Sequence, residues 1–335
     1  MKAFLIGGTG SGCGKTTLTL GLLRAFTRRG LKVQPYKVGP DYIDTGWHSA
    51  VSGVASRNLD AFMLPASTLN WLYNQHMQAA DIAVIEGVMG LYDGFGTDPN
   101  YCSSAGMAKQ LGCPVILLID GKAVSTSAAA TVLGFCHFDP EVRIAGVIVN
   151  RVNSEPHYQL LKQAIEKYTQ VPVLGRIPSL PNVSLPERHL GLITAHEQHD
   201  MDEQWNTLAD LLEQHIDLDR LLALSNVEPA TNASAPSLPA SESGRGLTMA
   251  LADDEAFHFY YPDNLQLLEQ IGVNIVRFSP LRDAALPECQ MVYIGGGYPE
   301  LHAETLTKNH AMRQSLRDAH QRGVAIYAEC GGLMY

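Results

Sequence analysis

The chain has 335 residues, of which 46% are hydrophobic and 17% are charged, and its formal net charge is −10. The length favours two domains that each bury a core, and the composition excludes intrinsic disorder. The acidic balance disfavours a nucleic-acid or anionic-membrane binder, since no Lys/Arg cluster is longer than Arg28-Arg29.

The cysteines and the hydrophobic runs indicate the cellular compartment. The six cysteines form no C-x-x-C pair and no Cys/His spacing typical of a metal site, so neither a disulfide framework nor a zinc site is expected. The apolar run at the N-terminus breaks at Gly7-Gly8, and no run of 18 apolar residues occurs. We therefore expect a cytoplasmic, reduced protein with no membrane span.

Short apolar runs alternate with amphipathic stretches along the first two thirds of the chain. The runs are nearly continuous, which is typical of parallel strands covered on both faces. We expect strands at 3–6, 33–38, 82–88, 114–120, 145–150 and 172–177, and helices at 15–29, 67–80, 125–135 and 155–168.

An Ala/Ser/Pro/Asn-rich stretch without apolar periodicity predicts a linker at 223–246, between domains at 1–222 and 247–335. The second part repeats the alternation. Its expected strands are 247–252, 273–278, 290–296 and 324–329, and its expected helices are 263–271 and 304–322. The fold class is therefore α/β in both parts, with neither an all-β domain nor a helix bundle.

The strongest chemical signal is a glycine-rich segment between the first strand and the first helix. Small residues there let backbone N–H groups and the helix N-terminus face phosphates, as in a P-loop. Lys15 would neutralise the β/γ-phosphates and Thr16 would bind Mg²⁺. The regular pattern departs at one position, because Thr9 stands where the first glycine is expected. The predicted nucleotide-binding residues are Gly10, Ser11, Gly12, Cys13, Gly14, Lys15, Thr16 and Thr17.

Several further motifs carry a family resemblance. In chain order they are KVGPDYIDTGWH (37–48), RNLD (57–60), EGVMGLYDG (86–94), PERHLGL (186–192), GGGYPE (295–300) and AECGGLMY (328–335). The P-loop resembles the variant form of dethiobiotin synthetase and its relatives. The whole series, from residue 8 to residue 335, resembles the cobyrinic acid a,c-diamide synthase family.

The resemblance implies a dethiobiotin-synthetase-like P-loop domain followed by a class I glutamine amidotransferase domain. It implies ATP- and glutamine- or ammonia-dependent conversion of two corrin carboxylates to amides, with ATP and Mg²⁺ as cofactors and a possible homodimer. In that family the histidine that activates the nucleophile lies downstream of the AECGG motif. Since this sequence ends at Tyr335, we expect an incomplete amidotransferase domain and no glutamine use by this chain alone.

Amide formation from a carboxylate requires its phosphorylation, and phosphoryl transfer requires positioning, Mg²⁺ and positive charge. Glu86 ends an apolar strand, so its carboxylate is expected beside the P-loop as a ligand of Mg²⁺ or water. Asp41 and Asp44 lie in the loop after the second strand and would hold metal or orient the acyl phosphate; the alternative is a turn that caps a helix. Lys37 would contact the transferred phosphate or the substrate carboxylate, or else lie in solvent.

Other residues have more open interpretations. Asn150 closes a strand and resembles the residue that reads the adenine edge in related P-loop enzymes, although a structural turn is an equal alternative. His48, Arg57 and Arg188 would pair with the carboxylates of the corrin, or would be ordinary surface residues.

Cys330 follows an apolar strand and precedes two glycines, which is typical of a sharp elbow that exposes a nucleophile. A lone cysteine is otherwise a small buried residue. The surrounding motif favours attack on the glutamine amide, with ammonia release and a glutamyl thioester. The glycines at 295–297 would donate N–H groups to an oxyanion hole.

Several alternatives remain at this stage: hydrogenobyrinic acid as the substrate, cobyric acid synthase, dethiobiotin synthetase, and a nucleotide-switch protein of the chromosome-partition or septum-positioning type. The last carries a signature lysine five positions before the P-loop lysine, where this chain has Gly10.

Overall fold

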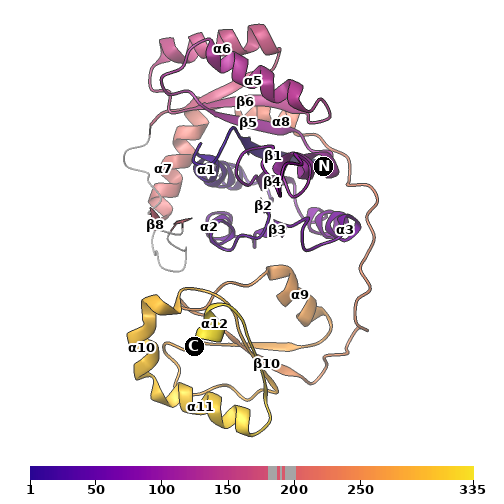
Figure 1. Ribbon diagram of the computed structural model, residues 1–335, viewed down its shortest axis with the longest axis vertical. Helices are drawn as coiled ribbons and strands as arrows, with labels where there is room; N and C mark the ends of the chain where they lie inside the picture. Colours follow the sequence, from indigo (N-terminus) through magenta and orange to yellow (C-terminus); the bar gives the residue numbers. More distant parts are fainter. Residues whose placement is uncertain (180–186, 189–190, 193–200) are drawn as a thin grey trace. The chain divides into compact units, whose positions relative to one another are not determined.

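The computed structural model describes residues 1–179, 187–188, 191–192 and 201–335. It divides into two compact units, Met1–Pro236 and Ser237–Tyr335 (Figure 1). None of the helices in the described part of the chain is long and apolar enough to cross a bilayer.

The first unit is built on a seven-stranded sheet in which every neighbouring pair is parallel. Its strand order is β3-β2-β4-β1-β5-β6-β7. All six predicted strands are present, and the additional β3 was missed because it has only three residues. The strands are β1 (Lys2–Gly8), β2 (Val33–Val38), β3 (Arg57–Leu59), β4 (Ile82–Glu86), β5 (Val115–Asp120), β6 (Ile144–Asn150) and β7 (Val173–Ile177).

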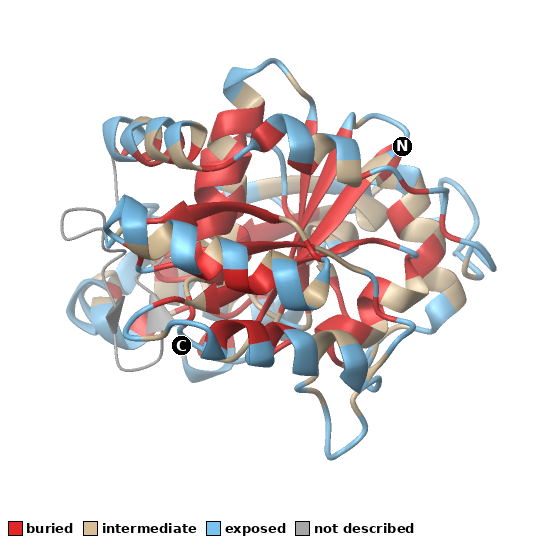
Figure 2. Cartoon of the chain, turned by 90° about the horizontal axis from the view of Figure 1, so that it is seen from above, coloured by how far each residue is buried: buried red, intermediate tan, exposed pale blue. Residues whose placement is uncertain are grey.

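Helices cover both faces of this sheet. Alternate strand residues face opposite sides, so Phe4 and Ile6 of β1 pack in one core cluster while Ala3 and Leu5 pack in the other. The first cluster includes residues of α1 (Lys15–Arg28), α2 (Ile43–Ser52), α7 (Asp202–His215) and α8 (Leu218–Leu224). The second includes residues of α3 (Ala66–Met77), α4 (Ser104–Gln110), α5 (Ser127–Phe138) and α6 (Glu155–Thr169). In Figure 2 the buried strands lie inside helices whose outer sides are exposed. The predicted α/β class is confirmed.

Part of the range predicted as a linker belongs to the first unit. Asn74 accepts from the N–H of Ala230 and donates to its carbonyl, and Asn70 donates to the carbonyl of Thr231. Further on, Ser234 donates its N–H to the carbonyl of Ser67. The backbone of this stretch is thus held against α3 by hydrogen bonds, which its amino-acid composition does not reveal.

The PERHLGL motif falls in the least described segment. Its residues 186, 189 and 190 lie outside the described residues, while β8 (Glu187–Arg188) and β9 (Gly191–Leu192) form an antiparallel pair. The side chain of Arg188 is not among those described.

The second unit has a four-stranded parallel sheet in the order β11-β10-β12-β13. The predicted strands are all present as β10 (Thr248–Ala252), β11 (Asn274–Phe278), β12 (Met291–Ile294) and β13 (Ala325–Ala328). The helical elements are α9 (Pro262–Gln270), the 3₁₀ turn η2 (Pro299–His302), α10 (Ala303–Lys308), α11 (His310–Gln321) and α12 (Gly331–Met334).

The single helix expected at 304–322 is two helices, α10 and α11. Asn309 separates them, because its side-chain oxygen caps Met312 N–H at 3.2 Å while its amide donates to the carbonyls of Pro280 and Asp283, each at 2.9 Å. The prediction of one continuous helix was wrong, since these tertiary hydrogen bonds override the helical pattern.

Candidate active site

The glycine-rich segment has the backbone that phosphate binding requires. Gly12 and Gly14 have φ of +71° and +102°, a region that disfavours other residues, and Gly14 is the residue before α1. The N-cap residue Gly14 makes no side-chain hydrogen bond to the helix, so the first N–H groups of the helix can face an anion. The Lys15 ammonium donates to the carbonyls of Gly10 at 3.2 Å and Met89 at 2.5 Å. The Lys15 side chain therefore folds back across the loop, to the place where phosphates would bind.

Asn150 and Arg151, at the end of β6, hold this loop by hydrogen bonds to its carbonyl groups. The Asn150 amide donates to the carbonyl of Cys13 at 2.7 Å, and Arg151 donates to the carbonyl of Gly12 at 2.8 Å while pairing with Asp120. A Cβ on Gly14 would lie 2.3 Å from the Asn150 amide nitrogen. Glycine is therefore required there both by its φ angle and by this close approach.

Glu86 is the centre of a buried polar network. It ends β4, and its side chain is 1% exposed. One carboxylate oxygen accepts from the Thr16 hydroxyl at 2.7 Å and from the Lys37 ammonium at 2.9 Å. The other lies 2.7 Å from Nε2 of His48, whose Nδ1 is 3.2 Å from the Ser56 hydroxyl. The network therefore joins the P-loop helix, two strands and α2 at the carboxyl edge of the sheet.

The charges in this network balance one another. Burial alone would lower the pKa of Lys37, but the negative charges of Glu86 and Asp44 outweigh it and raise that pKa above its ordinary value. Burial opposes ionisation of Glu86, yet Lys37 and His48 hold the pKa of this carboxyl well below its usual range. Lys37 and Glu86 are therefore both charged at neutral pH.

Asp41 and Asp44 have different roles in the loop that starts α2. The Asp41 carboxylate accepts the N–H groups of Ile43 at 2.9 Å and Asp44 at 2.8 Å, so the turn alternative applies to this residue. Asp44 instead pairs with Lys37 at 2.6 Å. Burial and the charge of Glu86 raise the pKa of Asp44 to about 6, although Lys37 opposes this shift.

These residues fit a nucleotide with its magnesium ion. Thr16 and Glu86 offer hard oxygen donors 2.7 Å apart next to the P-loop. In the described part of the chain no three His, Cys, Asp or Glu side chains gather in a metal-binding arrangement. Mg²⁺ does not require such a cage, since it typically takes one or two protein ligands with phosphate oxygens and waters.

His48 differs from its sequence-based interpretation as a partner of substrate carboxylates. It is fully buried between Glu86 and Ser56 and therefore cannot reach a substrate in this conformation. Its contact with Glu86 was missed because the sequence does not show that α2 packs beside the end of β4. The contributions of Arg151 and of the Met89 carbonyl were missed as well, and no residue pattern marks a backbone carbonyl.

The second unit contains the predicted elbow. Cys330 has φ of 50° and ψ of −120° between β13 and α12, and it is more exposed than the other five cysteines, which are buried or partly buried. A Cβ on Gly332 would lie 2.2 Å from the carbonyl oxygen of Ile294. The second glycine after the nucleophile is thus required by the close approach of α12 to β12.

Residues around Cys330 hold this elbow in place. The preceding Glu329 accepts from Tyr293 at 2.5 Å and Tyr327 at 3.1 Å. A Cβ on Gly296 would lie 3.3 Å from the Cys330 sulfur, so the glycine-rich turn passes directly beside the nucleophile. The N–H of Gly295 donates to the Tyr260 hydroxyl at 2.9 Å, so this member of the predicted oxyanion hole is already engaged.

Comparison with protein families assigns both units. Residues 4–193 match the CobQ/CobB/MinD/ParA nucleotide binding domain, and residues 248–335 match the CobB/CobQ-like glutamine amidotransferase domain. The fold and the site therefore define a P-loop nucleotide-binding domain, and the residues that follow match a glutamine amidotransferase domain.

Curated relatives narrow this class. Cobyrinate a,c-diamide synthase from Salmonella typhimurium is 67% identical over 333 residues, which cover 99% of this chain and 72% of the relative. The enzyme of the same name from Listeria monocytogenes serotype 4b is 52% identical over 336 residues, which cover 74% of it. The chain belongs to the cobyrinate a,c-diamide synthase family, and the family predicted from the motifs is confirmed.

Among solved structures, the crystal structure of the signal recognition particle receptor FtsY from Elizabethkingia anophelis aligns with 62% of this chain and 65% of its own. The identity is 17% and the TM-score is 0.38, a similarity too low to assign fold or function.

Proposed function

We propose that this chain converts the a and c carboxylates of cobyrinic acid to amides in cobalamin biosynthesis, with ATP as the activating substrate. The observation that carries this proposal is the buried network of Glu86, Lys37 and Thr16 beside the P-loop, in a chain whose relatives bear the name cobyrinate a,c-diamide synthase. Such a network would supply cations and a magnesium ligand to phosphoryl transfer.

In the first step a substrate carboxylate oxygen attacks the γ-phosphorus of ATP, ADP leaves, and an acyl phosphate forms. The N–H groups of the P-loop and Lys15 would bind the phosphates. The Lys37 ammonium, held by Asp44 and Glu86 in this structure, would exchange one of these partners for the transferred phosphoryl group or the carboxylate. Thr16 and Glu86 would hold Mg²⁺, which supplies charge neutralisation when bound. Asp41 fixes the loop that carries Asp44, and Asn150 fixes the P-loop from below.

In the second step ammonia attacks the acyl carbon, phosphate leaves, and the amide forms after loss of a proton. We assign ammonia release from glutamine to Cys330. Its thiolate would attack the side-chain amide carbon, the amide nitrogen would take a proton and leave as ammonia, and water would hydrolyse the resulting thioester to glutamate and the free thiol. The exposure of Cys330 and its positive φ support this role.

The test is amidation of cobyrinic acid by the purified chain with ATP, Mg²⁺ and ammonium chloride near pH 8.5, followed by mass spectrometry. The expected products are a monoamide and then a diamide, and each requires ATP. Parallel reactions with hydrogenobyrinic acid and with the a,c-diamide distinguish this activity from amidation of hydrogenobyrinic acid and from that of a cobyric acid synthase. ATP turnover without any corrinoid amide would refute the proposal.

A homodimer remains a further prediction, and sedimentation velocity of the chain over a range of concentrations tests it.

A further inference from the structure

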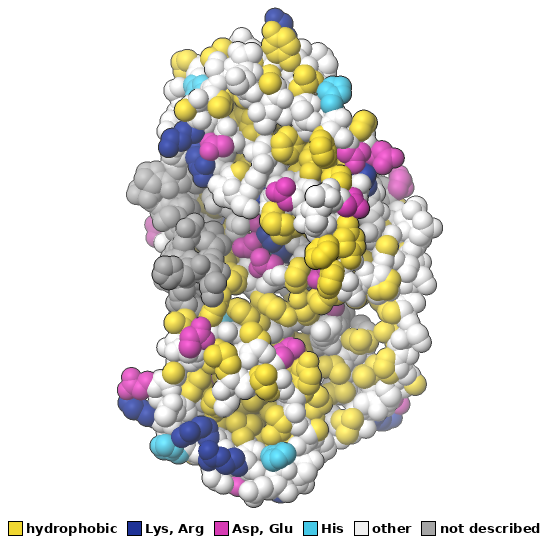
Figure 3. Space-filling view, viewed as in Figure 1, with side chains coloured by type: hydrophobic (Ala, Val, Ile, Leu, Met, Phe, Trp, Pro, Cys, Tyr) yellow, Lys and Arg dark blue, Asp and Glu magenta, His cyan; other side chains and the backbone are white. Residues whose placement is uncertain are grey.

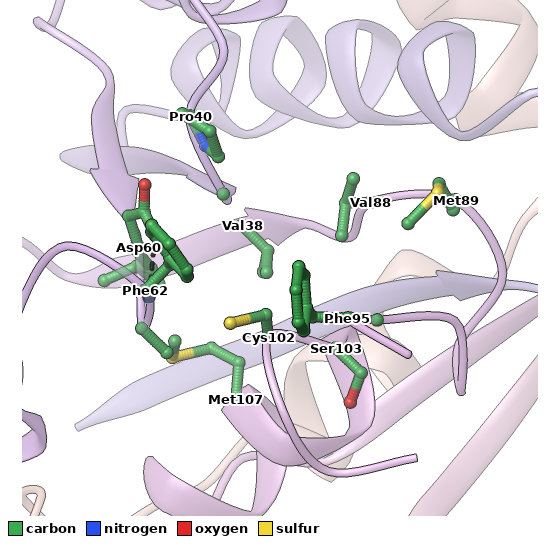
Figure 4. Close-up of a pocket in the computed structure, with 14 residues that line it drawn as sticks. Val38, Pro40, Asp60, Phe62, Val88, Met89, Phe95, Cys102, Ser103 and Met107 are labelled. Atoms are coloured by element: carbon green, nitrogen blue, oxygen red, sulfur yellow. Dashed lines mark hydrogen bonds between the residues drawn. The ribbon is translucent and has the colours of Figure 1, made fainter. Parts of the chain in front are cut away.

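A mainly apolar pocket opens next to the buried charged network of the first unit. Its volume is about 350 Å³, and it lies at the carboxyl ends of β2, β3 and β4, where α/β sheets bind ligands. Val38, Leu59, Val88 and Met107 contribute to its lining. In Figure 4 the side chains of Val38 and Cys102 lie between those of Phe62 and Phe95.

Three consecutive residues form the wall between this pocket and the charged network. The carbonyl of Gly87 accepts from Lys37 at 3.4 Å, and the carbonyl of Met89 accepts from Lys15 at 2.5 Å. Val88 and Met89 also line the pocket. A molecule bound in the pocket is therefore one short segment away from both lysines that would handle the phosphoryl group.

Two large aromatic side chains at the rim of the pocket are exposed to solvent. Phe62 and Phe95 are each 65% exposed, and their ring centroids are 6.2 Å apart. Figure 3 shows hydrophobic side chains gathered next to charged ones on this face of the first unit. Met89 and Cys102, which both line the pocket, have positive φ of 46° and 58°. Strained backbone of this kind clusters at ligand sites.

The pocket disfavours an anionic ligand because an acidic side chain lines it. Asp60 lines it, is 4% exposed, and has one carboxylate oxygen that caps the N–H of Phe62 at 2.8 Å. Its other oxygen is buried and has no hydrogen-bond partner among the described residues. A substrate carboxylate placed here would be repelled, whereas an alkyl edge or an N–H donor would be accepted.

We propose that this pocket binds the uncharged, methyl-bearing edge of the corrin macrocycle and so presents a neighbouring peripheral carboxylate to Lys37 and the P-loop. This inference rests on the proposed function. A volume of about 350 Å³ lies at the small end of ligand pockets, so the pocket takes one edge of the ring and not the whole macrocycle. The same edge-binding explains why the aromatic rim extends beyond the cavity.

The test compares Phe62→Ala and Phe95→Ala with a matched control, Phe138→Ala. Phe138 is 64% exposed, lies in the same unit and does not line the pocket, so all three variants remove an exposed ring. We expect the KM and the equilibrium Kd for cobyrinic acid to rise about tenfold in each pocket variant. The KM for ATP should stay within about twofold, and Phe138→Ala should match the unaltered chain.

The possible outcomes are distinct. If the unaltered chain amidates cobyrinic acid and both pocket variants keep its KM, the pocket is not the corrin site although the proposed function stands. If these variants instead lose self-association at unchanged KM, the rim is an interface between copies of the chain. If the unaltered chain neither binds nor amidates cobyrinic acid while it binds ATP, the proposed function itself fails.

Cobinamide, which keeps the ring but has amides at its periphery, should compete with cobyrinic acid in the unaltered chain and about tenfold less well in Phe95→Ala.

Discussion

The two units build their reactive centres in different ways. In the first unit Thr16, Lys37 and Glu86 come from separate parts of the chain and meet in a buried network of compensating charges. In the second unit Cys330 is exposed and is placed by its own backbone, with Gly331 and Gly332 allowing α12 to begin at once. Both centres use contacts between distant parts of the chain, but the first is a buried network of charges, whereas the second is an exposed side chain on a turn that Tyr293 and Gly296 support.

The difference has an energetic consequence. A buried ion that loses its partner typically costs about 3–5 kcal/mol of stability, because the remaining charge is left in a medium of low polarity. An exposed side chain at a turn carries no such cost. Substitutions in the first centre should therefore affect stability and activity together, and substitution of the nucleophile should affect activity alone.

The largest effect is expected at the P-loop. Lys15→Ala should abolish amidation with any nitrogen donor, by at least about a thousandfold in kcat, since the phosphate charge is no longer compensated. The measurement is ammonia-dependent amide formation, with nucleotide binding followed in parallel. Near-normal ATP-dependent amidation by this variant would contradict the assigned role of the P-loop.

Cys330→Ser tests the second centre in isolation. It should reduce any glutamine-supported amidation by about a thousandfold and leave the ammonia-supported rate within about twofold. Brief alkylation should modify Cys330 before the other five cysteines, which are buried or partly buried. Loss of the ammonia-supported rate on alkylation or in the serine variant would show that the two centres are not separable in this way.

Glu86→Gln combines both kinds of cost. It removes the negative charge that faces Lys37 and His48, so kcat should fall on the order of a hundredfold while ATP binding changes much less. Stability should fall by about 2 kcal/mol, less than for a fully unpaired ion, because Asp44 still pairs with Lys37. Urea unfolding followed by tryptophan fluorescence isolates this unit, since Trp47, Trp71 and Trp205 all lie in it. An unchanged kcat in a folded Glu86→Gln variant would make this carboxylate structural.

Much of this comparison could be predicted from sequence, and the rest could not for physical reasons. The strands and the elbow are local patterns, so apolar runs and the Cys-Gly-Gly order were sufficient to find them. His48 was assigned to the substrate because its partner lies 38 residues away, and sequence does not show which helix packs beside a strand end. For the same reason the ion pair of Asp44 with Lys37 was not visible. The turn at Asp41 is local and was one of two interpretations that the sequence left open.

His48 offers a sharper test of the long-range network. His48→Leu should raise the Mg²⁺ concentration needed for half-maximal activity about 10–100-fold, because Glu86 loses the group that orients it. His48→Gln should recover much of this loss, since its amide can donate to the same carboxylate oxygen. The KM for cobyrinic acid should stay within about twofold in both. Equal defects in the two variants at equal stability would exclude an orienting hydrogen bond.

The smallest effect concerns the pH dependence of stability at Asp44. Burial and Glu86 raise its pKa to about 6, against about 4 in the unfolded chain, so the folded state holds this proton more tightly. The stability that Asp44 contributes is therefore fully present below about pH 4 and is lost as the pH rises through about 6. Relative to Asp44→Asn, the unaltered chain should lose on the order of 1 kcal/mol between pH 4 and pH 7, measured by urea unfolding and tryptophan fluorescence. Asp139→Asn is the matched control, because the hydrogen bond from Lys109 lowers the pKa of Asp139 and reverses the expected direction. The stability difference between the unaltered chain and each variant could instead change with pH in the same direction for both aspartates. Asp44 would then behave as an ordinary surface ion pair, and the contrast between a buried first centre and an exposed second one would lose its electrostatic basis.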